Sequence, residues 1–132
     1  MGETLKFAAV GALAFMVLDG LWLGVLMKNF YRDQLAPIVR LSDGGIAPNW
    51  PAALVVYALL GAGIALFVIP RAPTLWSAAG YGTLFGLVVY GVYDFTNYST
   101  LRQWPFVLTL ADVAWGAVAS AAAATAVRGI VR

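Results

Sequence analysis

The chain has 132 residues, of which 62% are hydrophobic and 11% are charged, and its formal net charge is +2. The charged fraction is less than half of the roughly 25% that is usual in soluble domains, so a soluble monomer is excluded and a lipid bilayer is the expected environment. Cysteine and histidine are absent, which excludes disulfides and catalysis by a thiol or an imidazole. The small net charge gives no support for nucleic-acid binding.

Four apolar segments are each long enough to cross the ~20-residue hydrocarbon core as a helix. They run over about residues 5–27, 51–69, 75–98 and 104–127. Residues 69–74 and 99–103 form short connections between the last three segments, and Pro105 suits the first turn of a helix. The sequence therefore predicts an all-α integral membrane protein, with one domain over residues 1–132 and four transmembrane helices in two antiparallel hairpins.

The connection between the first two segments, residues 28–50, is longer than the others. Its apolar residues alternate with polar ones: Phe30, Tyr31, Leu35, Ile38, Val39 and Leu41 recur among Arg32, Asp33, Gln34 and Arg40. This pattern predicts an amphipathic helix at the membrane surface that ends at residues 42–45, with an ordinary connecting segment as the alternative. Trp50, Trp76 and Trp104 lie at segment ends and match an interfacial aromatic belt.

The distribution of basic residues leaves the orientation open, because four segments place both termini on one side. Each side has four basic residues: Lys6, Arg71, Arg128 and Arg132 on the side of the termini, and Lys28, Arg32, Arg40 and Arg102 on the other. The positive-inside rule gives no preference, and the free amino terminus favours cytoplasmic termini. We expect a multi-pass protein of the bacterial inner membrane.

Three aspartates, Asp19, Asp94 and Asp112, interrupt the apolar segments, where an ionisable group costs roughly 2.5–3.5 kcal/mol or more. Each lies about one or two turns from the segment end that faces away from the termini, so all three share a layer. Aromatic and polar side chains follow them at helical spacing. The candidate polar pocket is made of Asp19, Trp22, Tyr90, Asp94, Asn97, Tyr98, Asp112 and Trp115.

This cluster has three alternative uses. The leading hypothesis is that it binds a small lipophilic or lipid-derived molecule between aromatic walls, with or without processing it. The aspartates can instead hold the helices together by hydrogen bonds, as in a non-enzymatic accessory subunit of a larger complex or in a homo-oligomer. The third use is proton or cation translocation. The aspartates lack a metal-ligand spacing, so neither a metal nor a cofactor is expected, and enzymatic activity is left open.

Three motifs stand out: Asp-Gly-Leu-Trp at residues 19–22, Asp-Phe-Thr-Asn-Tyr at residues 94–98, and Asp-Val-Ala-Trp-Gly at residues 112–116. Together they resemble those of a family of small bacterial membrane proteins catalogued as domain of unknown function 2177. The resemblance extends over essentially the whole chain. It implies the four-span architecture with a long first loop and singles out the same residues, and it implies no reaction.

Overall fold

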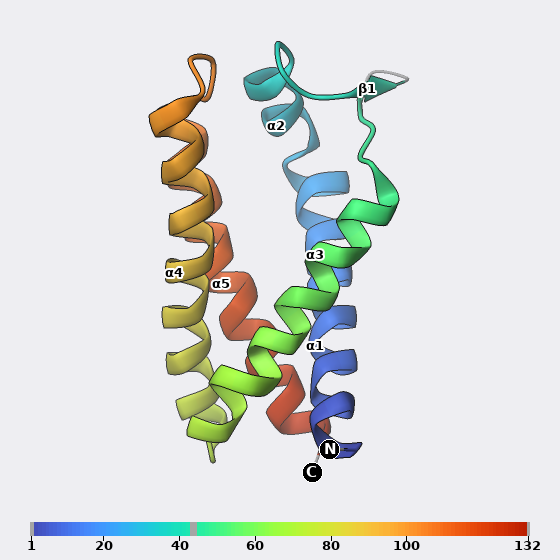
Figure 1. Cartoon of the computed structure of the whole chain (residues 1–132), viewed down its shortest axis with the longest axis vertical. Helices are drawn as coiled ribbons and strands as arrows, with labels where there is room; N and C mark the ends of the chain where they lie inside the picture. Colours follow the sequence, from blue (N-terminus) through green and yellow to red (C-terminus); the bar gives the residue numbers. More distant parts are fainter. Residues whose placement is uncertain (1, 43–44, 132) are drawn as a thin grey trace.

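The computed structural model describes residues 2–42 and 45–131, which form four long helices with a short helix and a small hairpin at one end (Figure 1). The first long helix, α1 (Gly2–Leu21), continues as the π-helical turn η1 (Trp22–Leu26). The second, α3 (Trp50–Gly63), continues as the π-helical turn η2 (Ile64–Val68) and the 3₁₀ turn η3 (Ile69–Arg71). The last two, α4 (Leu75–Thr100) and α5 (Phe106–Ile130), are continuous.

All four long helices have the length and composition needed to cross a membrane. The candidate spans in the described chain are Gly2–Leu26, Trp50–Arg71, Leu75–Thr100 and Phe106–Ile130. The prediction of an all-α protein with four membrane-spanning helices is therefore confirmed. Arg132, which was counted with the basic residues, and Asp43 and Gly44, within the predicted end of the loop helix, lie outside the described residues.

The helix starts follow from local hydrogen bonding. Thr74 and Ser77 form a reciprocal cap at the start of α4, in which each hydroxyl accepts from the other residue's backbone N–H at 3.0 Å. Asn49 caps α3 by accepting from the backbone N–H of Ala52 at 3.3 Å, and a proline follows in the first turn. These bonds satisfy backbone donors that the first turn of a helix leaves without partners.

The helices pack as two antiparallel hairpins, α1 with α3 and α4 with α5, and α1 also lies along α5 (Figure 1). Both hairpins contain glycine where the backbones approach closely. A Cβ atom at Gly61 would lie 2.8 Å from the backbone nitrogen of Ala12, and one at Gly86 would lie 2.7 Å from the carbonyl carbon of Gly116. Small residues are what permit such approach between membrane helices, where packing replaces the hydrophobic effect as the driving force.

The core occupies the half of the bundle nearest the termini, where all four helices meet. Its fully buried members include Phe15 of α1, Ile64 of η2, and Ala119, Ala123 and Val127 of α5. The outer surfaces of the same helices carry exposed leucine, valine and phenylalanine side chains, as expected for helices that face lipid.

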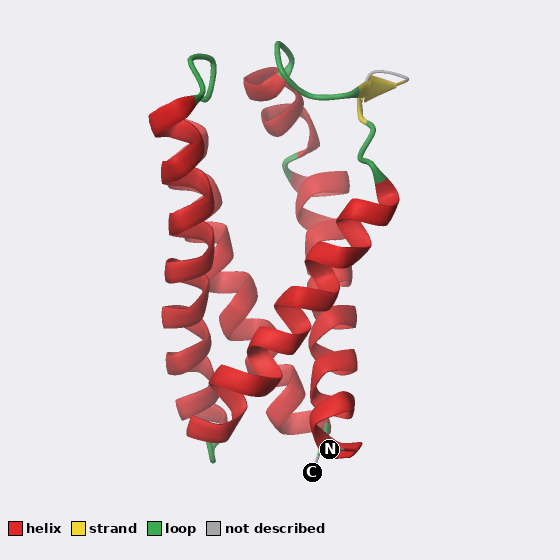
Figure 2. Ribbon diagram, viewed as in Figure 1, coloured by secondary structure: helices red, strands yellow, loops and turns green. Residues whose placement is uncertain are grey.

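The other end of the bundle is covered by α2 (Lys28–Leu35) and a short antiparallel pair, β1 (Leu41–Ser42) with β2 (Gly45–Ile46) (Figure 2). A helix is present in the first loop, but it ends at Leu35, before the predicted end at residues 42–45. Pro37 gives the physical reason, since proline disfavours helical backbone in the preceding residue and has no N–H to continue the helix.

Candidate functional site

Asp19 is held by two hydrogen bonds from two other helices. Its Oδ1 accepts from the indole Nε1 of Trp115 in α5 at 2.8 Å, and its Oδ2 accepts from the hydroxyl of Tyr57 in α3 at 3.0 Å. Each oxygen therefore has a donor, and one carboxyl group connects α1, α3 and α5. Buried polar groups with all partners in place stabilise and orient the helices that supply them.

Asp112 is held by a chain of two bonds. The hydroxyl of Tyr31 in α2 donates to Oδ1 of Asp112 at 2.8 Å, and the indole Nε1 of Trp22 donates to that same hydroxyl at 2.9 Å. Burial, assisted by the nearby charge of Asp112, raises the pKa of Tyr31 well above its ordinary value, so this hydroxyl keeps its proton and remains a donor.

The two tryptophans are stacked between the aspartates. The rings of Trp22 and Trp115 have centroids 4.4 Å apart and planes within 2° of each other. Each follows an aspartate by three residues, but each serves the aspartate of the other helix: Trp115 donates directly to Asp19, and Trp22 reaches Asp112 through Tyr31. The repeated spacing of α1 and α5 thus produces a reciprocal arrangement.

Asp94 differs from the other two aspartates. Its side chain is 0% exposed, and neither carboxyl oxygen has a hydrogen-bond partner within the described residues. The group with which it interacts most strongly is the carboxyl of Asp112, which lies close enough to accept a hydrogen bond from a protonated Asp94. Asp112 in turn lies within electrostatic range of Asp19. The three aspartates therefore form one electrostatic cluster, with Asp112 between the other two.

The remaining predicted site residues divide into two groups. Tyr90 packs against Gly116 and lies within electrostatic range of Asp19 and Asp112. Asn97 interacts with Tyr93, one turn earlier on α4, and Tyr98 is 46% exposed. The ring of Tyr98 contacts Phe106 at a centroid distance of 5.2 Å. The structure thus brings Tyr90 to the aspartates, and Asn97 adjoins them through Tyr93, which lies within electrostatic range of Asp94 and Asp112. Tyr98 instead contacts Phe106.

Sequence reasoning missed two residues that bind the aspartates directly, Tyr31 and Tyr57. In the sequence, Tyr31 belongs to the apolar face of the predicted loop helix, and Tyr57 lies within an apolar segment without a distinguishing motif. The hydroxyl of Tyr57 was a usable signal, because a polar group in a span needs a partner from another helix.

Two cavities lie apart from the aspartates. One, of about 530 Å³, is lined by residues near the two termini, including Arg128. The other, of about 480 Å³, is an apolar groove between α1 and α5. Neither includes an aspartate, and within the described part of the chain no three acidic side chains are grouped closely enough to hold a metal ion.

Comparison with known proteins matches one family. The model of the family described as Predicted membrane protein (DUF2177) covers residues 4–128. No curated protein and no solved structure matches the chain at the level of significance required.

Proposed function

The chain belongs to the DUF2177 family of predicted membrane proteins, and we propose that it binds a small lipophilic or lipid-derived molecule through the polar cluster around Asp94. One observation carries the proposal: the Asp94 carboxyl is fully buried and lacks a hydrogen-bond donor among the described residues. A buried acceptor without a donor costs about 1–3 kcal/mol, and more when it is charged. A molecule that brings a donor to Asp94 removes this cost.

A second buried group at the same end of the α4–α5 hairpin also lacks a hydrogen-bond partner in the part of the chain that the structure describes. This is the indole Nε1 of Trp104, whose ring lies edge-on to Tyr93, the residue before Asp94, at a centroid distance of 5.9 Å. Asp94 therefore presents an acceptor and Trp104 a donor, and neither has a hydrogen-bond partner among the described residues. A hydroxyl group is the simplest complement, because it donates and accepts at once. We infer a ligand with a hydroxyl or amine group on an apolar body.

The short helix α2 controls access in this proposal. Its Tyr31 and Leu35 pack on Trp104 and Leu108, and the Tyr31–Asp112 bond anchors it to α5. Because Tyr31 of α2 binds Asp112, which is the neighbour of Asp94, we infer that movement of α2 away from α5 opens a route to Asp94. An eight-residue helix that contacts the bundle through the Tyr31 hydroxyl and a small apolar cluster is a suitable element for such opening.

The test is the identity of molecules that co-purify with the protein. The wild-type chain, Asp94→Asn and the control Asp33→Asn, which changes an exposed aspartate of α2, are purified from the same membranes in mild detergent. We expect native mass spectrometry to find one small molecule bound to the wild type and the control and absent from Asp94→Asn. The same molecule in all three proteins, or none in any, refutes the proposal.

A non-enzymatic accessory subunit is the second candidate function. It is favoured by the satisfied hydrogen bonds of Asp19 and Asp112, which act between helices and need no ligand. Chemical cross-linking in native membranes tests it, because an accessory subunit yields a reproducible heteromeric product. A chain that cross-links only to itself or not at all excludes this role.

We further propose that the protein lies in the bacterial inner membrane with both termini in the cytoplasm. The chain has no native cysteine, so single Gly2→Cys and Arg102→Cys variants report the two sides directly. A membrane-impermeant maleimide added to intact cells should label the Arg102→Cys variant alone. Labelling of the Gly2→Cys variant alone would show that the termini lie on the opposite side of the membrane.

A further inference from the structure

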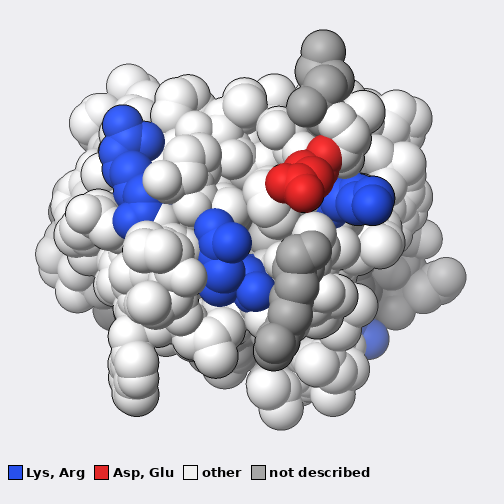
Figure 3. All heavy atoms as spheres, turned by 90° about the horizontal axis from the view of Figure 1, so that it is seen from below, with Lys and Arg blue, Asp and Glu red and all other residues white. Residues whose placement is uncertain are grey.

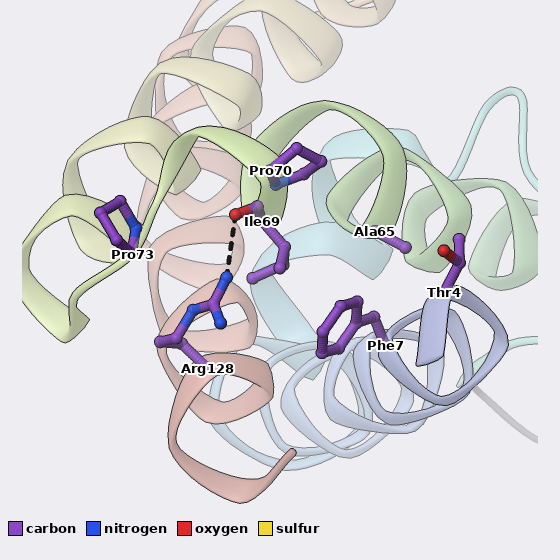
Figure 4. Close-up of a pocket in the computed structure, with 7 residues that line it drawn as sticks. All are labelled: Thr4, Phe7, Ala65, Ile69, Pro70, Pro73 and Arg128. Carbon is purple, nitrogen blue, oxygen red and sulfur yellow. Dashed lines mark hydrogen bonds between the residues drawn. The ribbon is translucent and has the colours of Figure 1, made fainter. Parts of the chain in front are cut away.

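The larger cavity, of about 530 Å³, lies at the end of the bundle that carries the termini. It is formed by the first turns of α1, the end of the second span and the last turns of α5. Figure 4 shows Arg128 pointing toward the carbonyl of Ile69, with Pro73 on one side of it and Phe7 and Thr4 on the other. Its volume is within the range of about 300–1,000 Å³ that small-molecule sites occupy.

Arg128 is a fixed but incompletely partnered cation. Its Nη2 donates to the backbone carbonyl of Ile69 at 2.9 Å, and its guanidinium carbon lies 5.8 Å from the centroid of the Phe7 ring. Its Nε is buried and has no partner within the described residues. Because a guanidinium has five N–H donors, most of its hydrogen-bonding capacity remains available.

Among the described residues, no acidic side chain forms an ion pair with this cation. The ion pair that the described residues form joins Arg32 to Asp33, at the opposite end of the bundle. Glu3 is exposed and does not line the cavity. Figure 3 shows basic side chains spread over the terminal face, with acidic atoms confined to one spot on it. The cavity therefore attracts an anion.

We propose that this cavity binds a phosphate group, as carried by an anionic phospholipid headgroup, with Arg128 as its charged contact. The planar donor fork of arginine matches the oxygens of a phosphate in pairs. Arg128 lies near the end of a membrane-spanning helix, at the level where headgroups lie and where basic residues recognise anionic lipids. Thr4 offers a hydroxyl, while Phe7 and Pro70 provide apolar walls for the glycerol portion.

This site is independent of the ligand proposed for Asp94, since the two lie at opposite ends of the bundle. It is tested by titrating the purified protein in maltoside micelles with dihexanoyl phosphatidylglycerol and, separately, with inorganic phosphate. We expect the lipid to bind the wild type and to bind Arg128→Gln at least about tenfold more weakly, a change of about 1.4 kcal/mol. Binding of inorganic phosphate with the same dependence on Arg128 would support the phosphate site and identify a soluble source.

Arg71→Gln is the matched control. Arg71 lies at the same end, is exposed, and also donates to a backbone carbonyl, that of Phe67 at 3.0 Å, but it does not line the cavity. We expect this variant to bind like the wild type. Equal weakening in both variants indicates a general surface-charge effect and overturns the proposal, as does unchanged binding in Arg128→Gln.

A second variant covers the case in which Arg128→Gln fails to fold. Thr4→Phe places bulk in the cavity while leaving Arg128 and its bond to Ile69 in place. We expect it to keep the wild-type melting temperature and to lose lipid binding. Wild-type affinity in this variant overturns the proposal.

Discussion

Trp22 and Trp115 stack with their ring planes within 2° of each other, although they lie on the first and last spans of the chain. The stack brings together the two places where an aspartate precedes a tryptophan by three residues. Both indole N–H groups then reach the other helix's aspartate: Trp115 donates directly to Asp19, and Trp22 donates to the Tyr31 hydroxyl that binds Asp112. The ring contact and the polar contacts therefore support the same α1–α5 interface.

The stacking of Trp22 on Trp115 should be measurable as a coupling free energy between the two residues in a double-mutant cycle. Trp22→Ala and Trp115→Ala each remove one ring, and the double variant should be less destabilised than the sum of the single variants by about 0.5–1.5 kcal/mol. Unfolding in mixed micelles with increasing sodium dodecyl sulfate measures this difference. Trp22→Ala combined with Trp76→Ala is the control, because Trp76 is 88% exposed, and this pair should be additive. Additivity in the Trp22–Trp115 cycle contradicts the contact.

The three aspartates should respond differently to replacement by asparagine. Asp19→Asn keeps one oxygen, which can accept from either Trp115 or Tyr57. The amide N–H₂ then faces the other donor. We expect a loss of about 1–3 kcal/mol in the free energy of unfolding. Asp94→Asn replaces a buried ionisable group by a neutral amide that can still donate to Asp112, so we expect unchanged or higher stability.

Melting temperatures of the two variants, purified without added ligand, separate these outcomes. Asp33→Asn reports the effect of removing an exposed carboxylate and should lie within about 0.5 kcal/mol of the wild type. If Asp94→Asn proves as unstable as Asp19→Asn, Asp94 has a structural partner, and the proposed ligand site loses its main support.

The convergence of Asp19 and Asp112 could be predicted because it depends on features that sequence records well. Four apolar segments with short connections set the hairpins, and the Asp-x-x-Trp spacing places each ring one turn from a carboxyl group. The sequence does not indicate how each helix is rotated about its own axis. When most faces of a span are apolar, hydrophobic periodicity no longer indicates which face turns inward. Tyr57 was missed for this reason.

Trp104 and Tyr98 lie near span ends, and their surroundings differ from those that the sequence predicts. Trp104 was assigned to an interfacial belt, yet it is 9% exposed and packs under α2 with Tyr31 and Leu35. Tyr98 shares a helical stripe with Asp94 in the sequence, yet its ring lies on Phe106. Both outcomes depend on where the loop helix α2 and the start of α5 lie, and tertiary packing of this kind has no local signature.

The close approach of α4 and α5 predicts a sharp difference between two glycines of one helix. In Gly86→Ala the new methyl group would overlap the backbone of Gly116 and would also lie 2.7 Å from Oγ of Ser120. Separating the helices to make room should cost about 1–3 kcal/mol. Gly80→Ala meets no atom within 4 Å and should be neutral or stabilising by up to about 1 kcal/mol. Thermal unfolding of both variants in the same detergent measures the contrast, and similar melting temperatures contradict the packing.

The Tyr31 hydroxyl should make stability depend on pH in the alkaline range. Burial raises the pKa of Tyr31, so above about pH 10 the unfolded chain releases this proton while the folded chain retains it. The folded state then binds more protons, and the free energy of unfolding must fall as pH rises, by at most about 1.4 kcal/mol per pH unit. Tyr31→Phe lacks this proton as well as the bond to Asp112. It should be less stable than the wild type at pH 8, and the gap should narrow above pH 10.

Melting temperatures recorded for both proteins from pH 8 to pH 12 measure the gap. Asp33→Asn, at an exposed position of the same short helix, should follow the wild-type curve throughout, because its loss leaves the Tyr31–Asp112 bond intact. Parallel curves for the wild type and Tyr31→Phe across this range would mean that the hydroxyl ionises equally in the folded and unfolded chains. The Tyr31–Asp112 bond would then not hold α2 against the bundle, and the access route proposed for Asp94 would lose its anchor.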